Sequence, residues 1–398
     1  MNISSSQVES IVRKILGEMA PSSSAGAPIP KTAKVAMLTA TKKIEVKEYP
    51  IPPVGDNDIL VKVEGCGVCG TDVHEWKGDP FGIIPVTLGH EGTGEIIALG
   101  KNVKTDTAGK PIKVGDKIVT SVISCGECHV CRNHPANTNL CDAQGVFGLI
   151  PHSDKNPLTG WFATHLLISG KGATYFVVNE LDLQERMLLE LACVCVHALK
   201  RAQSTGLINF NSKVLVQGLG PVGLVMISVL RAAGVNHIVA IDGTPKRLDM
   251  ARKLGAKTVV SFKEITSLEQ RVALVKSVCN GVGVDFAFQC TGAPMAAKDI
   301  YEYIRRGGGM CEMGFFVNNG EYTVNPHFAM CNKEITIVGS WDYSADDYPT
   351  TVAFLRQARE MNIPIKELIT HSYPLDKLNE AMETNVSQTG IKICYVAE

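Results

Sequence analysis

The chain has 398 residues, of which 45% are apolar and 20% are charged, and its formal net charge is −1. This length is natural for two domains rather than for a single core. The balanced charge excludes the basic excess that recruits nucleic acid or an anionic membrane. No apolar run reaches the roughly 18 residues that a membrane span needs, because the best candidate, Val214–Leu230, is interrupted by Gln217 and by glycines. We therefore expect a soluble globular protein that binds neither nucleic acid nor membrane.

The first residues predict a short amphipathic helix from Ser6 to about Met19. Ser6 and Glu9 have the spacing of a capping box. The apolar residues fall on one face at helical spacing: they are Val8, Ile11, Val12, Ile15, Leu16 and Met19. Residues 21–31 form a flexible linker rich in Ser, Pro, Ala and Gly. Because so short a helix is marginal alone in water, we expect residues 1–20 to dock onto another surface.

Residues 32–192 predict a β-rich domain, in which short alternating segments such as Ile59–Val63, Glu95–Ala98 and Lys117–Val122 are separated by Gly, Pro and Asp. Residues 193–335 alternate apolar strands with helical patterns, which predicts a doubly wound parallel sheet. The expected strands are Lys213–Gln217, His237–Ile241, Thr258–Ser261, Val284–Gln289 and Met310–Met313. Residues 336–398 return to short strands and one helix. The fold class expected is therefore α/β with two domains.

The glycine-rich turn at residues 218–223 predicts a dinucleotide site. The strand ending at Gln217 runs straight into Gly218-Leu-Gly220-Pro221-Val222-Gly223, and an apolar helix follows. Gly218 permits a tight turn, Gly220 lets backbone approach the pyrophosphate, and Gly223 allows the helix to pack closely on the strand. The helix N-terminus attracts the phosphates.

A second strand ends at Asp242, at the expected distance from the glycines. Its carboxylate is able to accept hydrogen bonds from both hydroxyls of the adenosine ribose and repels a 2′-phosphate, which favours NAD(H). The alternative is NADP(H), because Lys246 and Arg247 lie where they would reach a phosphate.

Four of the thirteen cysteines are closely spaced: Cys125, Cys128, Cys131 and Cys141. The N-terminus lacks the apolar segment of a signal peptide, so we expect a cytoplasmic chain whose clustered cysteines bind metal rather than form disulfides. In a loop rich in Gly, His, Asn and Pro, this spacing predicts a closed tetrahedral site for a structural Zn²⁺. An iron–sulfur cluster is the alternative, but the fourth cysteine comes too late and lacks the proline of that motif.

A second set of metal-binding residue types is dispersed along the chain. Gly67-Val-Cys69-Gly-Thr71-Asp72-Val-His74 is followed by Gly89-His90-Glu91-Gly, and Glu190 precedes His197. A thiolate, an imidazole and carboxylates are the mixture expected of a catalytic Zn²⁺ that keeps one coordination position open.

In these motifs, and in their order, residues 31–398 resemble the zinc-containing medium-chain dehydrogenases, particularly the branch of alcohol, sorbitol and threonine dehydrogenases. The resemblance implies a GroES-like catalytic domain, closed by the C-terminal strands, around an inserted Rossmann domain. It implies a catalytic Zn²⁺ on Cys69 and His90, with Glu190 as the further ligand and Glu91 as an alternate ligand. Leu191 stands where the pattern has proline, and the last lobe cysteine comes later than usual.

The resemblance also implies a proton relay through Thr71 and His74, and a homodimer or homotetramer. A helix-capping hydroxyl and a structural histidine are the plainer interpretations of these two residues. We expect an oxidoreductase that interconverts a short-chain alcohol or polyol and its aldehyde or ketone, with two Zn²⁺ per chain and NAD(H). A zinc-free quinone or enone reductase and a non-catalytic binding scaffold are the competing hypotheses, and the retained zinc ligands argue against the first.

The N-terminal extension resembles the encapsulation peptides of bacterial microcompartment cargo enzymes. Its apolar face, within residues 3–19, would lie in a groove on a shell protein or on another cargo enzyme. This predicts aldehyde reduction and NAD recycling inside a microcompartment. The alternatives are an oligomerisation helix and a mitochondrial presequence, of which the second is disfavoured by Glu9 and Glu18.

Overall fold

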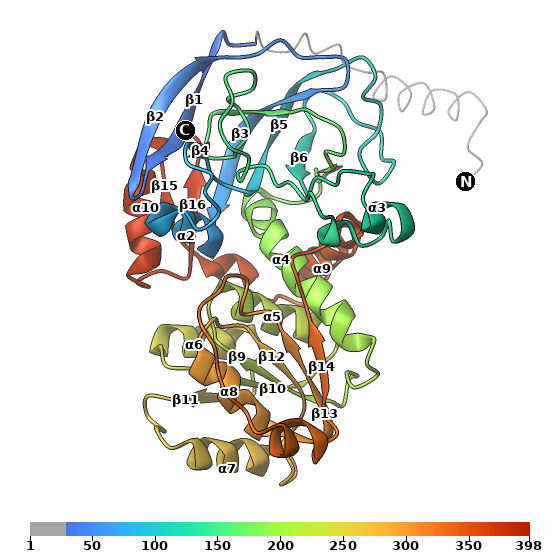
Figure 1. Cartoon of the computed structure of the whole chain (residues 1–398), viewed down its shortest axis with the longest axis vertical. Helices are drawn as coiled ribbons and strands as arrows, with labels where there is room; N and C mark the ends of the chain where they lie inside the picture. Colours follow the sequence, from blue (N-terminus) through green and yellow to red (C-terminus); the bar gives the residue numbers. More distant parts are fainter. Residues whose placement is uncertain (1–28) are drawn as a thin grey trace, which may run out of the picture.

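The computed structural model describes residues 29–398, as two domains joined by a long helix (Figure 1). The predicted N-terminal helix and most of the predicted linker lie outside the described residues. No helix of the described chain is both long enough and apolar enough to cross a membrane.

The first domain is built from two sheets of mostly antiparallel strands. A three-stranded sheet has the order β2-β1-β4, and a larger sheet has the order β15-β16-β3-β5-β6-β8 with β7 beside β3. The strands are β1 (Thr32–Ala40), β2 (Lys43–Pro50), β3 (Ile59–Val68), β4 (Val86–Thr87), β5 (Glu91–Leu99), β6 (Lys117–Thr120), β7 (His165–Ile168), β8 (Tyr175–Val177), β15 (Ile369–Tyr373) and β16 (Lys392–Val396). The predicted β-rich domain is therefore confirmed.

The second domain is a six-stranded parallel sheet of order β11-β10-β9-β12-β13-β14, which is the order of dinucleotide-binding domains. Its strands are β9 (Lys213–Gln217), β10 (His237–Asp242), β11 (Thr258–Ser261), β12 (Val284–Gln289), β13 (Ile304–Glu312) and β14 (Thr336–Gly339). The first four match the predicted strands closely, whereas β13 begins well before the predicted Met310.

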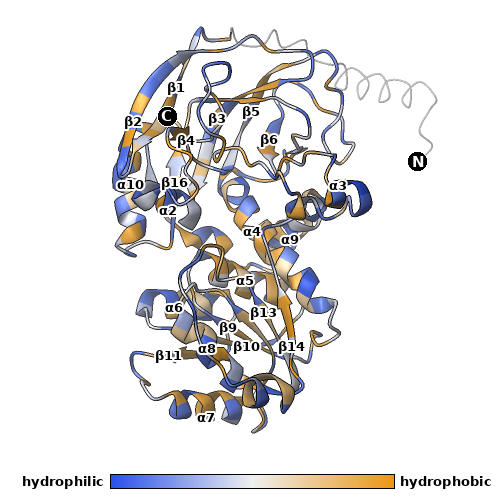
Figure 2. Ribbon diagram, in the orientation of Figure 1, coloured by the Kyte–Doolittle hydropathy of each residue, from blue (hydrophilic) through white to orange (hydrophobic). Residues whose placement is uncertain are grey.

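Alternate residues of strands β9, β10, β12 and β13 face two different hydrophobic clusters. On β9, Val214 and Val216 belong to a cluster with helices α4, α5, α6 and α9, while Leu215 belongs to a cluster with α7 and α8. The helices are α4 (Leu183–Gln203), α5 (Pro221–Ala232), α6 (Pro245–Leu254), α7 (Leu268–Val278), α8 (Pro294–Tyr303) and α9 (Tyr348–Glu360). Strand β14 of this sheet has the orange colour of hydrophobic residues in Figure 2. Burial on both faces explains why the strands read as continuous apolar runs.

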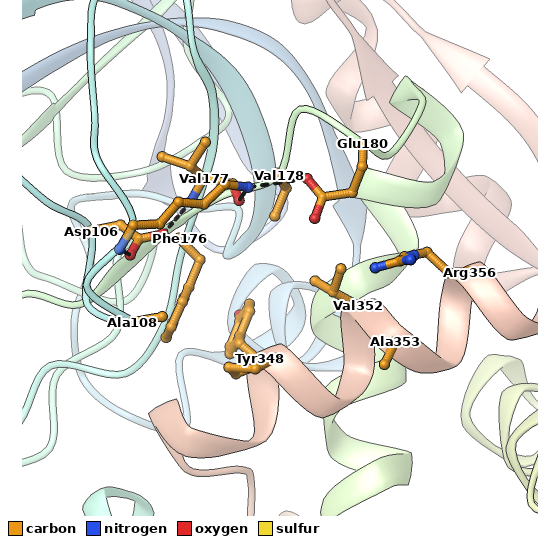
Figure 3. A pocket seen from close by; sticks show the side chains of 12 residues that line it. Asp106, Ala108, Phe176, Val177, Val178, Glu180, Tyr348, Val352, Ala353 and Arg356 are labelled. Atoms are coloured by element: carbon orange, nitrogen blue, oxygen red, sulfur yellow. Dashed lines mark hydrogen bonds and ion pairs between the residues drawn. The ribbon is translucent and has the colours of Figure 1, made fainter.

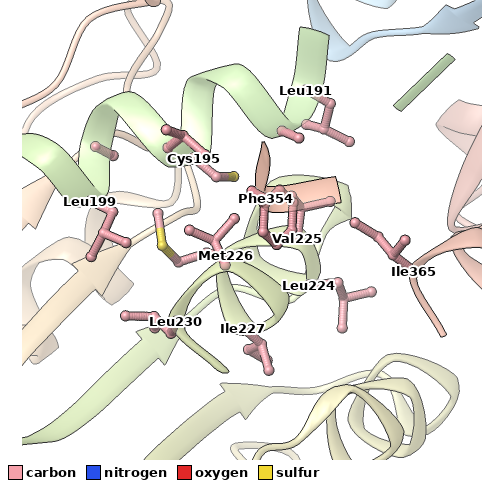
Figure 4. Packing of buried hydrophobic residues seen from close by; sticks show 14 of the residues in the cluster. Leu191, Cys195, Leu199, Leu224, Val225, Met226, Ile227, Leu230, Phe354 and Ile365 are labelled. Carbon is pink, nitrogen blue, oxygen red and sulfur yellow. The ribbon is translucent and has the colours of Figure 1, made fainter. Parts of the chain in front are cut away.

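Helix α4 joins the two domains and packs against both. It contacts β3 and β5 of the first domain. It also contacts α5 and α9, which belong to the hydrophobic cluster on one face of the parallel sheet. Cys195 and Leu199 of α4 lie over Met226 and Leu230 of α5, with Phe354 of α9 alongside (Figure 4). The predicted domain boundary between residues 192 and 193 falls inside this continuous helix, and it is therefore corrected.

The end of the second domain also differs from the prediction. β14 is the sixth strand of the parallel sheet, so the sheet extends to Gly339 rather than ending at residue 335. The chain then returns to the first domain, where β16 pairs antiparallel with β3 and places Cys394 opposite Gly67. Two helices, α9 and α10 (Leu378–Val386), lie in this return where one was predicted, because two separate segments each bury an apolar face.

Candidate functional site

The candidate catalytic residues meet where β3 ends and β5 begins. The antiparallel register places Gly67 opposite Glu91. Cys69 follows β3 as the residue before helix α2 (Gly70–Gly78), and His90 and Glu91 stand at the start of β5. Ligand atoms of Cys69, His90 and Glu91 all lie within 4.8 Å of one another. Sheet register thus brings together three residues that the sequence keeps apart.

Asp72 holds this arrangement in place. Its carboxylate accepts hydrogen bonds from the backbone N–H of Cys69 at 2.8 Å and of Gly89 at 3.1 Å, and it lies 3.4 Å from His90 Nδ1. Burial opposes a charge on His90, but Asp72 and the Cys69 thiolate outweigh it and raise the pKa of the imidazole well above its usual value. The surroundings of His90 therefore favour a positive charge, which a bound cation would supply.

The donor atoms of Cys69, His90 and Glu91 are suited to binding a metal ion. His90 Nδ1 and Glu91 Oε1 are buried and have no hydrogen-bond partner in residues 29–398, whereas Glu91 Oε2 contacts an ammonium group. Buried polar atoms are rarely left without a partner. A thiolate, an imidazole and a carboxylate are donors that suit Zn²⁺.

Glu91 has a charged neighbour that the sequence analysis missed. The ammonium of Lys392, on the last strand β16, contacts the Glu91 carboxylate and also donates to the backbone oxygen of Val68 at 3.1 Å. Both side chains are almost completely buried, with exposed fractions of 2% and 0%. A lysine inside the apolar run Ile391–Val396 is the only local signal, because a buried lysine requires a partner.

Glu190 lies on α4, outside the group of atoms within 4.8 Å of one another. Burial, opposed by His90 and reinforced by Glu91, raises the pKa of Glu190 to about 8. The charges of His90 and Glu91 therefore act on the Glu190 carboxylate, although this carboxylate is not among the ligand atoms that lie within 4.8 Å of one another. No ion pair joins Glu190 to a cation in the described chain.

Thr71 and His74 both lie on α2, immediately after Cys69. Thr71 Oγ1 is 3.7 Å from Cys69 Sγ. His74 is half-buried and meets the ring of Phe316 edge-on, with centroids 5.4 Å apart. Burial and then Lys77 lower the pKa of His74. Because Phe316 follows β13, this contact spans the two domains beside the cluster.

The four lobe cysteines converge as a second cluster. Their sulfur atoms all lie within 4.8 Å of one another, and the backbone N–H groups of Cys125, Cys128 and Cys131 donate to Sγ atoms of the set at 3.3 to 3.4 Å. Backbone donors, first that of Cys131, lower the pKa of Cys128 to about 6, whereas burial and neighbouring thiols raise that of Cys131 to about 12. Four thiolates this close are compatible with one another only around a cation, so the donor set fits Zn²⁺. None of the thirteen cysteines is in a disulfide.

The glycine turn leads from β9 into α5. Gly218 has φ of +87°, and a Cβ on Gly223 would lie 1.9 Å from the Gly218 oxygen. A Cβ on Gly220 would meet nothing within 4 Å, so this side of the turn is open. Pro221 and Val222 form the first turn of α5, whose N-terminal N–H groups are free for a phosphate.

Asp242 is buried at the end of β10, and its carboxylate accepts hydrogen bonds from nearby backbone N–H groups. It accepts from the backbone N–H groups of Leu219 at 2.8 Å, Gly243 at 2.7 Å and Thr244 at 2.8 Å. A carboxylate has about four acceptor positions, so Asp242 has room for about one ribose hydroxyl rather than two. Arg247 is half-buried nearby on α6, and its Nε has no partner in residues 29–398.

Comparison with known proteins identifies the family to which this chain belongs. The profile of zinc-binding dehydrogenases matches residues 221–357, and that of the alcohol dehydrogenase GroES-like domain matches residues 55–180. Sorbitol dehydrogenase of Bacillus subtilis is 31% identical over 361 residues, covering 89% of this chain and 94% of that protein. The chain belongs to the zinc-binding dehydrogenase family.

Two further relatives support this assignment. D-xylulose reductase A of Aspergillus oryzae is 30% identical and covers 92% of this chain and 98% of its own. A solved structure of an alcohol dehydrogenase from Thermotoga maritima has a TM-score of 0.85 and 29% identity, covering 92% of this chain and 100% of that one. The GroES-like and Rossmann domains predicted from sequence are thus confirmed, and this zinc-binding dehydrogenase has alcohol and polyol dehydrogenases as relatives.

One cavity of the dehydrogenase, of about 210 Å³, lies away from both clusters (Figure 3). It lies between β8 and α9, with Phe176, Tyr348 and Val352 as apolar lining and Lys110 and Arg356 among its charged residues. The rings of Phe176 and Tyr348 are stacked, with centroids 4.7 Å apart. None of the predicted site residues lines this cavity, so it has no part in the proposed chemistry.

Proposed function

We propose that this dehydrogenase interconverts a short-chain alcohol or polyol and its aldehyde or ketone, with NAD(H) as the hydride carrier and one catalytic Zn²⁺. The observation that carries the proposal is the convergence of Cys69, His90 and Glu91, with His90 Nδ1 buried and without a partner in residues 29–398, in a member of this family. The sorbitol dehydrogenase and D-xylulose reductase among the relatives support an alcohol or polyol as the substrate.

Charge balance supports Glu190 as the third protein ligand, with Glu91 as the alternate. The carboxylate of Glu91 is already compensated by the ammonium of Lys392. Glu190 has no such partner in the described residues, and burial raises its pKa. A divalent cation between Cys69, His90 and Glu190 would supply the missing positive charge, because buried carboxylates require one.

Zn²⁺ bound here would act as a Lewis acid on the substrate oxygen and so favour loss of the alcohol proton near neutral pH. NAD⁺ bound at the glycine turn would take up the hydride. In the chain itself, Thr71 Oγ1 is placed beside Cys69 to accept a proton from the substrate hydroxyl and pass it on. His74, whose pKa is lowered by burial, is neutral at pH 7 and able to take that proton to solvent.

The structural site is proposed to hold a second Zn²⁺ on Cys125, Cys128, Cys131 and Cys141. A homodimer or homotetramer is proposed as well. Its support is the edge strand β14, which has a free edge and an exposed Ile337. Unpaired sheet edges of this kind are surfaces for strand pairing, and sedimentation velocity measures the resulting mass.

The reaction is tested by a substrate panel. Purified wild-type enzyme is given NAD⁺ with simple alcohols and polyols, and NADH with the corresponding aldehydes and ketones and with a quinone, while absorbance of NADH is followed. We expect turnover with members of both classes. A zinc-free quinone reductase would instead consume reduced cofactor with quinones only, and a binding scaffold would give no turnover with any of them.

We predict that NAD(H) is preferred over NADP(H) because Asp242 repels a 2′-phosphate. Replacing it, as Asp242→Asn, removes the repulsion and a charged acceptor, so the ratio of kcat/KM for NAD⁺ to that for NADP⁺ should fall by about 10- to 100-fold. This ratio is informative because general damage to the glycine turn would weaken the binding of NAD⁺ and of NADP⁺ equally and leave the ratio unchanged. The control is Asp249→Asn, an exposed carboxylate on the same helix as Arg247. A wild-type enzyme that prefers NADP⁺ would contradict the prediction and favour a role for Arg247 at the phosphate.

For residues 3–19 we propose encapsulation in a bacterial microcompartment, through a shell protein or another cargo enzyme. These residues lie outside the described chain, and the proposal rests on their amphipathic pattern. Residues 1–30 fused to a fluorescent protein should form puncta in cells that produce shells. Ile15→Glu, on the apolar face, should disperse them, whereas Arg13→Glu, on the polar face, should not. Diffuse fluorescence of the unaltered fusion would refute encapsulation.

A further inference from the structure

Asn139 attaches the cysteine lobe, which spans residues 124–144, to a distant part of the chain. It lies two residues before Cys141, and its exposed fraction is only 4% in a lobe that is otherwise mostly exposed or half-buried. Its side-chain nitrogen donates to the backbone oxygen of Trp341 at 2.7 Å, and its side-chain oxygen accepts from Ser344 Oγ at 3.0 Å. Both partners belong to the segment between β14 and α9.

Further hydrogen bonds join the lobe to this segment. Ser344 Oγ also donates to the backbone oxygen of Ala136 at 2.6 Å, and the backbone N–H of Ala345 donates to Thr138 Oγ1 at 3.1 Å. The contacts come from neighbouring lobe residues between Ala136 and Asn139, so they form together only when the lobe holds one conformation. Because the lobe buries little apolar surface, metal binding at its cysteines supplies that conformation.

The side chain of Asn139 also lies against helix α4, because its Nδ2 is 3.5 Å from His197 Nε2. His197 Nδ1 donates to Asp347 Oδ2 at 2.7 Å. The buried carboxylate of Asp347 also contacts the ammonium of Lys200 on α4 and accepts from the backbone N–H of Ser344 at 2.9 Å. With its proton on Nδ1, a neutral His197 has a lone pair on Nε2 that accepts from Asn139. The lobe, the segment before α9 and helix α4 therefore meet at His197.

Helix α4 in turn contacts the helix that begins at the glycine turn. Cys195, two residues before His197, is fully buried, and its Sγ donates to the backbone oxygen of Val222 at 3.3 Å. Val222 lies in the first turn of α5, where free N–H groups are proposed to bind the phosphates of the dinucleotide. Figure 4 shows Cys195 and Leu199 of α4 beside α5. The printed contacts thus run from the cysteine lobe through α4 to the dinucleotide turn.

We infer that Asn139 is a positioning residue that couples metal binding in the cysteine lobe to the affinity of the dinucleotide site. The inference rests on the proposed structural Zn²⁺ and the proposed NAD(H) site, and it makes the second depend on the first. The lobe changes between an ordered state with metal and a disordered state without it, and only the ordered state presents Asn139 to His197. Coupling between two sites is reciprocal, so bound NADH strengthens zinc binding in the lobe by the same factor.

Two equilibrium measurements test the inference without following turnover. The Kd of NADH is measured by isothermal titration calorimetry for wild-type enzyme, for Cys128→Ser, which lacks one lobe ligand, for Asn139→Leu and for the double variant. The affinity of the lobe for zinc is measured by competition with a chromophoric chelator, with and without saturating NADH. Asn139→Leu keeps the size and branching of the side chain but removes its donors and its acceptor. The matched control is Asn137→Leu, at an exposed residue of the same lobe whose side chain makes no capping hydrogen bond.

We expect Cys128→Ser to bind NADH about 10-fold more weakly than wild-type enzyme does. Asn139→Leu should weaken NADH binding by a similar factor although it retains both zinc ions, and the double variant should be no weaker than either single variant. Asn137→Leu should bind NADH as wild-type enzyme does. Saturating NADH should raise the affinity of the lobe for zinc about 10-fold in wild-type enzyme and leave it unchanged in Asn139→Leu. A substitution that only destabilised the lobe would keep this response to NADH.

Unchanged NADH binding in Cys128→Ser would overturn the inference. So would losses that add in the double variant, because the two residues would then act independently. If Cys128→Ser does not fold, the response of zinc affinity to NADH in wild-type enzyme and in Asn139→Leu decides alone, and no response in wild-type enzyme refutes the coupling. All these outcomes leave the proposed dehydrogenase function intact. A wild-type enzyme that binds no NADH, or whose lobe holds no zinc, would refute the proposed sites and the inference together.

Discussion

His90→Ala is expected to abolish NAD⁺-linked alcohol oxidation while the protein stays folded. The imidazole is one of the three side chains whose ligand atoms lie within 4.8 Å of one another. Loss of a ligand would lower metal occupancy and with it several kcal/mol of transition-state stabilisation. Since about 4 kcal/mol corresponds to a factor of about 10³, kcat/KM should fall by about 10³-fold or more. Zinc content should fall from two ions per chain to one.

The control is His237→Ala, an exposed histidine at the start of β10. It should retain both zinc ions and full activity. Circular dichroism should report unchanged secondary structure in both variants, because His90 lies immediately before β5 and takes no part in the pairing of β5 with β3. If His90→Ala kept two zinc ions and full turnover, the assignment of the catalytic site would be wrong.

Cys128→Ser is expected to empty the structural site and destabilise the lobe. Backbone donors, first that of Cys131, lower the pKa of its thiol to about 6, and it caps the short helix α3 (His129–Asn133) by accepting from the Cys131 N–H. The lobe between Ile123 and Gly145 is mostly exposed and is closed at its base by hydrogen bonds between these two residues. Because little apolar burial orders such a loop, metal binding supplies most of its folding free energy.

Two measurements check this prediction. Zinc analysis should give one ion per chain, and proteolysis should become fast within residues 125–141. The thermal midpoint should fall by on the order of 10 °C, since each 1 kcal/mol shifts it by about 2–4 °C in a protein domain of 150–250 residues. Cys331→Ser, at an exposed cysteine outside the lobe, is the control. Unchanged zinc content and protease resistance in Cys128→Ser would argue against a metal in the lobe.

The second domain could be predicted well because its signals are local. Strands β9 to β12 are short apolar runs bounded by turns, and the glycine turn at residues 218–223 has a strand on one side and a helix on the other. The boundary at residue 192 was misplaced for the opposite reason. Helix α4 is capped at Asp182 and continues to Gln203, and nothing in its sequence marks the point where its neighbours change from one domain to the other.

Some residues of the candidate site could likewise be predicted from local motifs, and others could not. Cys69 and His90 lie in compact motifs, so sequence alone identified them. The nearness of Glu91 to both depends on the register between β3 and β5. Lys392 could not be paired with Glu91 from sequence, because the contact forms only when the last strand β16 returns to β3.

The central claim, that Cys69 and His90 hold a catalytic zinc in an NAD-linked dehydrogenase, is tested most directly by following metal content and turnover together. Wild-type enzyme is depleted stepwise with a chelator, and each sample is analysed for zinc and for NADH formation from its preferred alcohol. We predict two zinc ions per chain at the start, turnover that falls in proportion to the loss of one of them, and recovery when Zn²⁺ is added back. Full turnover in enzyme that retains only the zinc of the cysteine lobe would contradict the account.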